Sequence, residues 1–162
     1  MLLDPENRSM TARAEALLYA AARAQHVEDV IRPALARGQI VLCDRFVDSS
    51  LVYQGIGRNL GVEKIKEINH FATGGLEPDL TFVIQIDQAE GLRRKDAQQN
   101  GRLDRLESEK GDFHSRVHDG FSALAKWYPR RVKRIDGAAE PSRVHQQIME
   151  ALQPYLQRLR PQ

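Results

Sequence analysis

The chain has 162 residues, which is enough for one domain, and its 41% hydrophobic content can supply a core. Its 24 Lys and Arg against 22 Asp and Glu give a net charge of +2, too balanced to indicate a nucleic-acid or membrane-surface protein. No apolar stretch is long enough to span a membrane, and the N-terminus lacks a signal pattern, so we expect a soluble cytoplasmic protein. The single cysteine, Cys43, lies in an apolar run, which favours a buried structural thiol.

The first long element is a helix predicted from about residue 10 to residue 37, with a kink at Pro33. Tyr19 and Arg23 are one turn apart on it and share a face. A tyrosine ring can stack on a nucleobase, and a guanidinium can donate to base carbonyls. Ordinary helix packing is the alternative explanation for this pair.

The next stretch combines an apolar run with polar residues directly after it. Ile40 to Cys43 predict a strand buried on both faces, and open α/β sheets bind ligands where such strands end. Asp44 suits Mg²⁺ or its waters, and Arg45 suits a phosphate. A helix is expected from residue 48 or 49, with three side chains on one face that suit a flat polar ring and its sugar: Ser50, Tyr53 and Gln54. The alternative is a surface ion pair followed by a solvated helix face.

The rest of the chain alternates between helices and strands, which indicates an α/β fold with a parallel sheet flanked by helices. The predicted elements are a loop over 55–58, helices over 62–73, 108–126 and 142–159, and strands over 80–86 and 131–135. Asp87 is expected to cap a short helix. His114 and His118 are one turn apart and could chelate a metal, but no third ligand is near them, so we predict no metal site there.

Residues 93–107 are basic, and their composition is typical of a flexible segment. Three functions compete: a solvated loop, a nucleic-acid patch, and a mobile lid. The nucleic-acid patch lacks interleaved aromatic residues, so we predict that no nucleic acid binds. A lid suits phosphoryl transfer because its arginines neutralise the charge that develops on the transferring oxygens.

Residues 39–55 resemble the Asp-Arg-aromatic segment of thymidylate kinases, which phosphorylate dTMP to dTDP with ATP. Residues 17–27 resemble the helix that holds thymine in that family, where Phe usually takes the place of Tyr19. The resemblance covers nearly the whole chain. It implies a single domain over 1–162 with a three-layer, P-loop-kinase-like parallel sheet, and a homodimer.

The resemblance also implies roles for individual residues. Tyr19 would stack on thymine and Arg23 would bind its carbonyl edge. Asp44 would position Mg²⁺ and the acceptor phosphate, which Arg45 would bind. Ser50 and Gln54 would contact the base, and Tyr53 would lie against the sugar and disfavour a 2′-hydroxyl. Arg94 would be the lid arginine, with Arg102 and Arg105 as weaker candidates. Asp136 and Ala138 would lie beside the adenine of ATP.

One part that the family needs is not found in the sequence. No Gly-x-x-x-x-Gly-Lys-[Ser/Thr] motif occurs, and this is the loop whose backbone N–H groups cradle the donor phosphates. We interpret the sequence as an N-terminally truncated thymidylate kinase that lacks the first two strands of the family fold and is inactive by itself. The alternative is a non-catalytic nucleotide-binding or assembly module that retains only the dTMP half-site.

Overall fold

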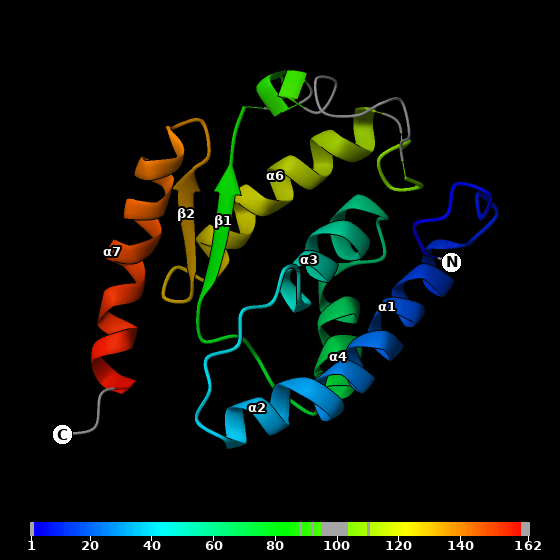
Figure 1. Cartoon of the computed structure of the whole chain (residues 1–162). Helices are drawn as coiled ribbons and strands as arrows, with labels where there is room; N and C mark the ends of the chain where they lie inside the picture. The colour runs from blue at the N-terminus through cyan, green and yellow to red at the C-terminus, as the bar shows by residue number, and fades with distance from the viewer. Residues whose placement is uncertain (1, 88, 92, 95–103, 110, 160–162) are drawn as a thin grey trace. The chain divides into compact units, whose positions relative to one another are not determined.

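The computed structural model describes residues 2–87, 89–91, 93–94, 104–109 and 111–159. They form two compact units (Figure 1). Unit 1 consists of Met1–Glu77 and Arg102–Gly120, and unit 2 of Pro78–Gly101 and Phe121–Gln162. None of the described helices combines the length and the apolarity that crossing a membrane requires.

The first long helical region of unit 1 confirms the prediction over residues 10–37, but it is not uniform. Helix α1 spans Ala12–His26, the π-helix η1 spans Val27–Ile31, and helix α2 spans Arg32–Ala36. The Thr11 hydroxyl accepts the Ala14 N–H at 3.2 Å and caps the start of α1. The change of helix type falls directly before Pro33, where the missing N–H interrupts the α-helical ladder.

The predicted buried strand over Ile40 to Cys43 is wrong. These residues form no strand, and Leu42 is 89% and Ile40 60% exposed. Cys43 is exposed as well, so the prediction of a buried thiol is also wrong. An apolar run becomes a strand only when another backbone satisfies its N–H and C=O groups, and no described strand pairs with this one.

The helix after Arg45 begins at Val47, slightly earlier than predicted. Helix α3 spans Val47–Ser50 and continues into the π-helix η2, Leu51–Gly57. Its N-cap is Phe46, without a side-chain cap, rather than residue 48 or 49. The loop predicted over 55–58 is therefore wrong for residues 55–57. Glycine at this point allows close packing, because a Cβ on Gly57 would lie 2.7 Å from the Phe113 ring.

Helix α4 spans Val62–Thr73 and confirms the prediction for this segment. Gly74 ends it in the left-handed conformation, with φ of 56°, which glycine adopts without steric cost. Ile65, Asn69 and Thr73 are spaced one turn apart and are all buried. In unit 1, α4 packs against α1, α3 and η2 (Figure 1).

Unit 2 contains the parallel sheet that the sequence predicts. Strand β1, Thr81–Gln85, pairs with β2, Val132–Asp136, in a parallel register from Thr81 opposite Val132 to Gln85 opposite Asp136. Helix α7, Pro141–Leu159, packs against β2 (Figure 1). Helix α6, Gly111–Trp127, contacts β1 through a 2.7 Å hydrogen bond from the Gln85 amide to the Ser122 hydroxyl. The α/β class is confirmed, with two strands among the described residues.

Candidate functional site

The side chain of Arg23 lies at the centre of a hydrogen-bonded cluster in unit 1. One of its terminal nitrogens donates to the Asn69 amide oxygen, and the other donates to the Ser50 hydroxyl at 3.0 Å and the Phe46 carbonyl at 3.3 Å. The guanidinium also lies over the Phe46 ring, 5.6 Å from its centroid. Within the described residues these acceptors are all neutral, and no carboxylate forms an ion pair with Arg23.

This arrangement is unusual because a cation removed from water is normally paired with an anion. Burial lowers the pKa of the Arg23 guanidinium from its ordinary value, although arginine stays protonated at neutral pH. Among the described residues, the positive charge of Arg23 is therefore held in place by neutral groups alone.

A second cation lies on the turn that leads into α3. Arg45 is exposed, and its guanidinium lies 5.1 Å from the centroid of the Tyr53 ring. The backbone of Arg45 has φ of 62°, a left-handed conformation that is sterically unfavourable for a residue other than glycine. Neighbouring Asp44 is exposed, and no ion pair to another described residue engages its carboxylate. The turn thus presents a guanidinium and a carboxylate to solvent.

Tyr19 and Arg23, predicted to share a face of one helix, both lie on α1. The charge of Arg45 acts on Tyr19, and the charges of Tyr19 and Cys43 act on Arg23. Burial raises the pKa of the Tyr19 hydroxyl, with a further contribution from the negative charge of Glu15, while the charges of Arg105 and Arg45 act in the opposite direction. Desolvation raises the pKa of the Cys43 thiol, and the positive charge of Arg23 acts in the opposite direction. Tyr19, Arg23 and Arg45 all belong to unit 1.

The Gln54 side chain contacts a different group from Ser50 and Tyr53, with which it was predicted to share a helix face. Its side chain is only 2% exposed, and its amide nitrogen donates to Glu15 at 2.8 Å. Tyr53 is half-buried, with its ring 6.2 Å from that of Phe113. The predicted polar face therefore divides: Ser50 contacts Arg23, Tyr53 contacts Arg45, and the Gln54 amide nitrogen is directed to Glu15.

Glu15 is fully buried and joins three segments of unit 1. Its carboxylate accepts from Gln54 and forms ion pairs with Arg58 at 3.0 Å and with Arg105 at 2.5 Å. Arg105 also donates to the Leu2 carbonyl at 2.8 Å. Arg105, a weaker lid candidate from the sequence, is thus 5% exposed and committed to Glu15. Arg102 lies outside the described residues.

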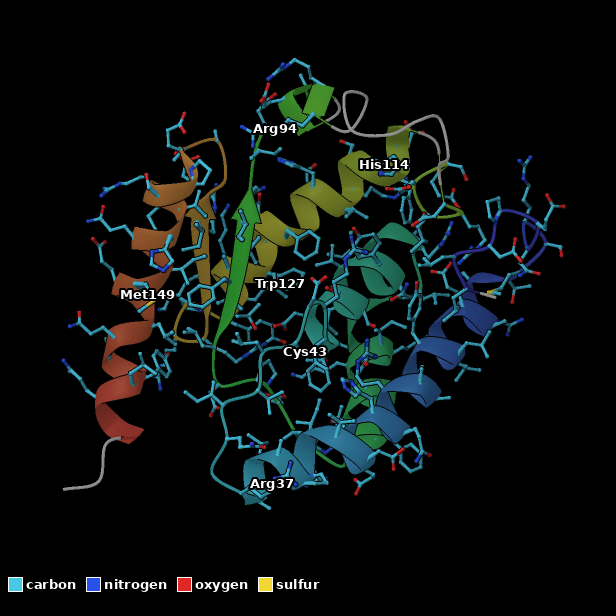
Figure 2. The ribbon with its side chains drawn as sticks, in the orientation of Figure 1. Arg37, Cys43, Arg94, His114, Trp127 and Met149 are labelled. Carbon is cyan, nitrogen blue, oxygen red and sulfur yellow. The ribbon has the colours of Figure 1, made fainter. Side chains whose placement is uncertain are left out.

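The predicted lid arginine, Arg94, and the predicted adenine-side residues, Asp136 and Ala138, belong to unit 2. Arg94 follows β1, Asp136 is the last residue of β2, and Ala138 comes two residues later. The Arg94 side chain is paired with Glu90 at 2.7 Å and donates to the Gly137 carbonyl at 3.1 Å (Figure 2). The Asp136 carboxylate accepts the Ala138 N–H at 3.0 Å, which shapes the turn after β2. The structure therefore brings Arg94 to the turn that carries Asp136 and Ala138.

No group of three or more His, Cys, Asp or Glu side chains that could hold a metal ion occurs among the described residues. His118 instead lies 3.5 Å from Asp119, and His114 lies 3.3 Å from the Glu107 carbonyl. That this histidine pair holds no metal stays a prediction.

The sequence reasoning did not single out Asn69 and Glu15. Both lie on the buried face of a helix. Glu15 is buried together with Ala16 and Ala20 on α1, and Asn69 is buried together with Ile65 and Thr73 on α4. A polar residue at an inward helical position was the signal that could have identified them, because buried polar groups require partners.

The family model, the curated relatives and the solved structure described below are all thymidylate kinases. A family model described as "Thymidylate kinase" matches residues 1–148. A curated thymidylate kinase of Lactobacillus helveticus is 51% identical over 156 residues, which are 96% of this chain and 74% of that protein. One from Lactobacillus delbrueckii subsp. bulgaricus is 51% identical over 140 residues, 86% of this chain and 66% of that protein.

A solved structure, that of thymidylate kinase from Ehrlichia chaffeensis, is similar with a TM-score of 0.67 and 30% sequence identity. The match covers 88% of this chain and 65% of that chain. The matches therefore span 65% to 74% of the lengths of these three relatives.

Proposed function

Because the chain belongs to the thymidylate kinase family, we propose that it binds dTMP and serves in the ATP-dependent phosphorylation of dTMP to dTDP. The observation that carries the proposal is Arg23, a partly buried cation that neutral acceptors hold without a described carboxylate partner. Such a charge suits an electron-rich group of a ligand, and the carbonyl edge of thymine is one.

The base end of the proposed site consists of Tyr19, Arg23 and Ser50. The ring of Tyr19 would stack on thymine, and Arg23 would donate to its carbonyl. Ser50, whose hydroxyl contacts Arg23, would lie beside the base. Tyr53 would lie against the sugar and disfavour a 2′-hydroxyl. Gln54 is directed to Glu15, so in our proposal it joins α1 to η2, and a direct base contact stays a prediction.

The phosphate end consists of Arg45 and Asp44. The exposed guanidinium of Arg45, which rests on the Tyr53 ring, would bind the phosphate of dTMP. The Asp44 carboxylate, which forms no ion pair with another described residue, fits Mg²⁺, which proteins commonly hold through one or two carboxylates together with waters and substrate phosphates. When bound, the ion would neutralise phosphate charge.

In the proposed reaction, an oxygen of the dTMP phosphate bonds to the γ-phosphorus of ATP while the bond from that phosphorus to ADP breaks. The residues of this chain would contribute by positioning the acceptor and neutralising its charge. We place Arg94 near the transferred group and the Asp136–Ala138 turn beside adenine, supported by the bond from Arg94 to the Gly137 carbonyl. A lid over residues 93–107 and a homodimer stay predictions.

A second candidate function is dTMP binding without phosphoryl transfer. The sequence contains no Gly-x-x-x-x-Gly-Lys-[Ser/Thr] motif, whereas the proposed dTMP-binding residues are all present in unit 1. Calorimetric titration with dTMP and ATP, together with an assay for ADP formation, separates the two functions. Binding of both nucleotides with turnover supports the kinase, dTMP binding alone supports the binding module, and no dTMP binding contradicts both.

Thymidine provides a test of the phosphate end. Arg45→Gln should weaken dTMP binding by about tenfold or more because a charge-assisted phosphate contact is lost. It should leave thymidine binding nearly unchanged, since thymidine has no phosphate. An equal loss for both ligands would show that Arg45 acts on the fold rather than on phosphate.

A further inference from the structure

We propose that Asn69 is a positioning residue that fixes the direction of Arg23 and thereby makes the site selective for a pyrimidine with a carbonyl at its 4-position over one with an amino group. This inference rests on the proposed function, since it assumes that the base lies at Arg23. It adds a residue that does not itself contact the ligand.

Asn69 is an unexpected residue at its position. It lies inside α4, only 4% exposed, although asparagine is a weak helix former and buried amides require partners at both ends. Both partners are present. The amide nitrogen donates to the Ile65 carbonyl at 2.7 Å, and the amide oxygen accepts from Arg23. The bond to Ile65 fixes which end of the amide faces the guanidinium.

The three acceptors of Arg23 come from three different segments. Asn69 belongs to α4, Ser50 to α3, and the Phe46 carbonyl to the turn before α3. A guanidinium has five N–H groups, of which these bonds use three. Asn69 is the acceptor on one terminal nitrogen, while the other two bonds share the second. Without Asn69, the guanidinium is held from one end only and can turn.

Selectivity follows from the chemistry of the remaining N–H groups. They can only donate, so they match a base carbonyl and oppose an amino group, which also donates. A site built to bond one polar group discriminates strongly against an analogue that leaves the protein group unpaired. The discrimination requires a fixed guanidinium, because a mobile one can turn away from the amino group.

The test compares dUMP and dCMP, which differ only at the edge that Arg23 would face, by calorimetric titration of the full chain. The main variant is Asn69→Leu, which removes both polar ends and keeps a branched side chain of similar size and good helix propensity. We expect the ratio of the dCMP and dUMP dissociation constants to fall by about tenfold. Asn69→Asp keeps the acceptor and should retain the ratio.

The matched control is Arg32→Gln. Arg32 also ties an N-terminal helix to α4, through bonds to the Thr73 carbonyl at 2.9 Å and the Gly74 carbonyl at 3.1 Å. It should lower the melting temperature and leave the dCMP-to-dUMP ratio unchanged. If Asn69→Leu does not melt cooperatively, Asn69→Ser replaces it, since serine is too short to reach Arg23.

The outcomes separate this inference from the proposed function. If the wild-type chain binds neither dTMP nor dUMP, the proposed function fails and the inference falls with it. If the wild-type chain binds both but the folded Asn69→Leu or Asn69→Ser variant keeps the ratio, the proposed function stands and the inference is overturned. A ratio that falls equally in Asn69→Asp also overturns it, because the acceptor would then be irrelevant.

Discussion

The carboxylate of Glu15 and the guanidinium of Arg105 form an ion pair at 2.5 Å with side chains only 0% and 5% exposed. The two residues are 90 positions apart in the chain. Arg58 joins them through Glu15 and continues to Glu109 at 2.5 Å. Two acids and two arginines therefore form a neutral ionic cluster that connects α1, the end of η2 and residues 104–109.

Removing the negative charge of Glu15 should lower the free energy of unfolding. Glu15→Gln leaves Arg105 buried without its carboxylate, and breaking a buried pair in this way typically costs about 3 to 5 kcal/mol. Urea unfolding should show a correspondingly lower free energy of unfolding. The control is Glu28→Gln, since the Glu28–Arg32 pair has side chains 66% and 41% exposed and should contribute about 1 kcal/mol or less. Equal losses in the two variants would contradict the prediction.

The same carboxylate predicts how stability depends on pH. Burial by itself raises the pKa of Glu15, but the hydrogen bonds from Gln54, Arg58 and Arg105 outweigh burial and hold the pKa below the ordinary 4.5. Because the folded-state pKa is lowered, the contribution of Glu15 to stability is fully present above pH 4.5 and is lost as the pH falls through the folded-state pKa.

Urea unfolding measured from pH 7 to pH 3 tests whether the pKa of Glu15 is lowered in the folded protein. The difference in unfolding free energy between the wild type and Glu15→Gln should be constant above about pH 5 and should shrink at lower pH. A difference that grows on acidification would mean that Glu15 has a raised pKa in the folded protein.

Two glycines of α6 provide a matched pair for packing. A Cβ on Gly120 would lie 2.9 Å from both Ile56 and Val52, whereas a Cβ on Gly111 would meet nothing within 4 Å. Gly120→Ala should therefore destabilise the protein by about 1 to 3 kcal/mol, despite the better helix propensity of alanine. Gly111→Ala should be neutral or slightly stabilising. Thermal unfolding of both variants is the measurement, and a stabilised Gly120→Ala would show that α6 and η2 do not pack as closely as described.

Cys43 should react with thiol reagents in the folded protein, because it is exposed. Its reaction should be slow at neutral pH. Although the residue is exposed, nearby protein atoms displace part of the water around the thiol and raise its pKa above the ordinary 9.0, and only the thiolate reacts. Intact mass after treatment with iodoacetamide at several pH values measures the rate. Labelling only after denaturation would restore the prediction of a buried thiol. If dTMP binds beside Arg23, it should also slow the labelling.

The elements predicted correctly are those with strong local signals. Helix α4 ends at Gly74 because only glycine readily takes the left-handed conformation there, and β1 follows directly from the apolar run before Asp87. Residues 40–43 have an equally apolar run, but whether such a run forms a strand depends on a distant partner backbone, which a local pattern does not contain.

The candidate site divides in the same way. Tyr19, Arg23, Asp44 and Arg45 are predicted because their residue types and spacing suit nucleotide chemistry, and their roles stay predictions. The direction of Gln54 toward Glu15 was missed, because it depends on how α1 packs against η2. The link between Asn69 and Arg23 joins positions 46 residues apart, and no short motif records such a pair.

The backbone of Arg45 has a consequence for attempts to improve this protein. A residue other than glycine with φ of 62° carries a conformational cost of about 1 to 3 kcal/mol. Laboratory selection for heat resistance alone would therefore favour glycine or asparagine at this position and enrich chains that tolerate high temperature without their guanidinium. Selection for nucleotide binding would instead favour arginine, so the two selections would enrich different residues at position 45.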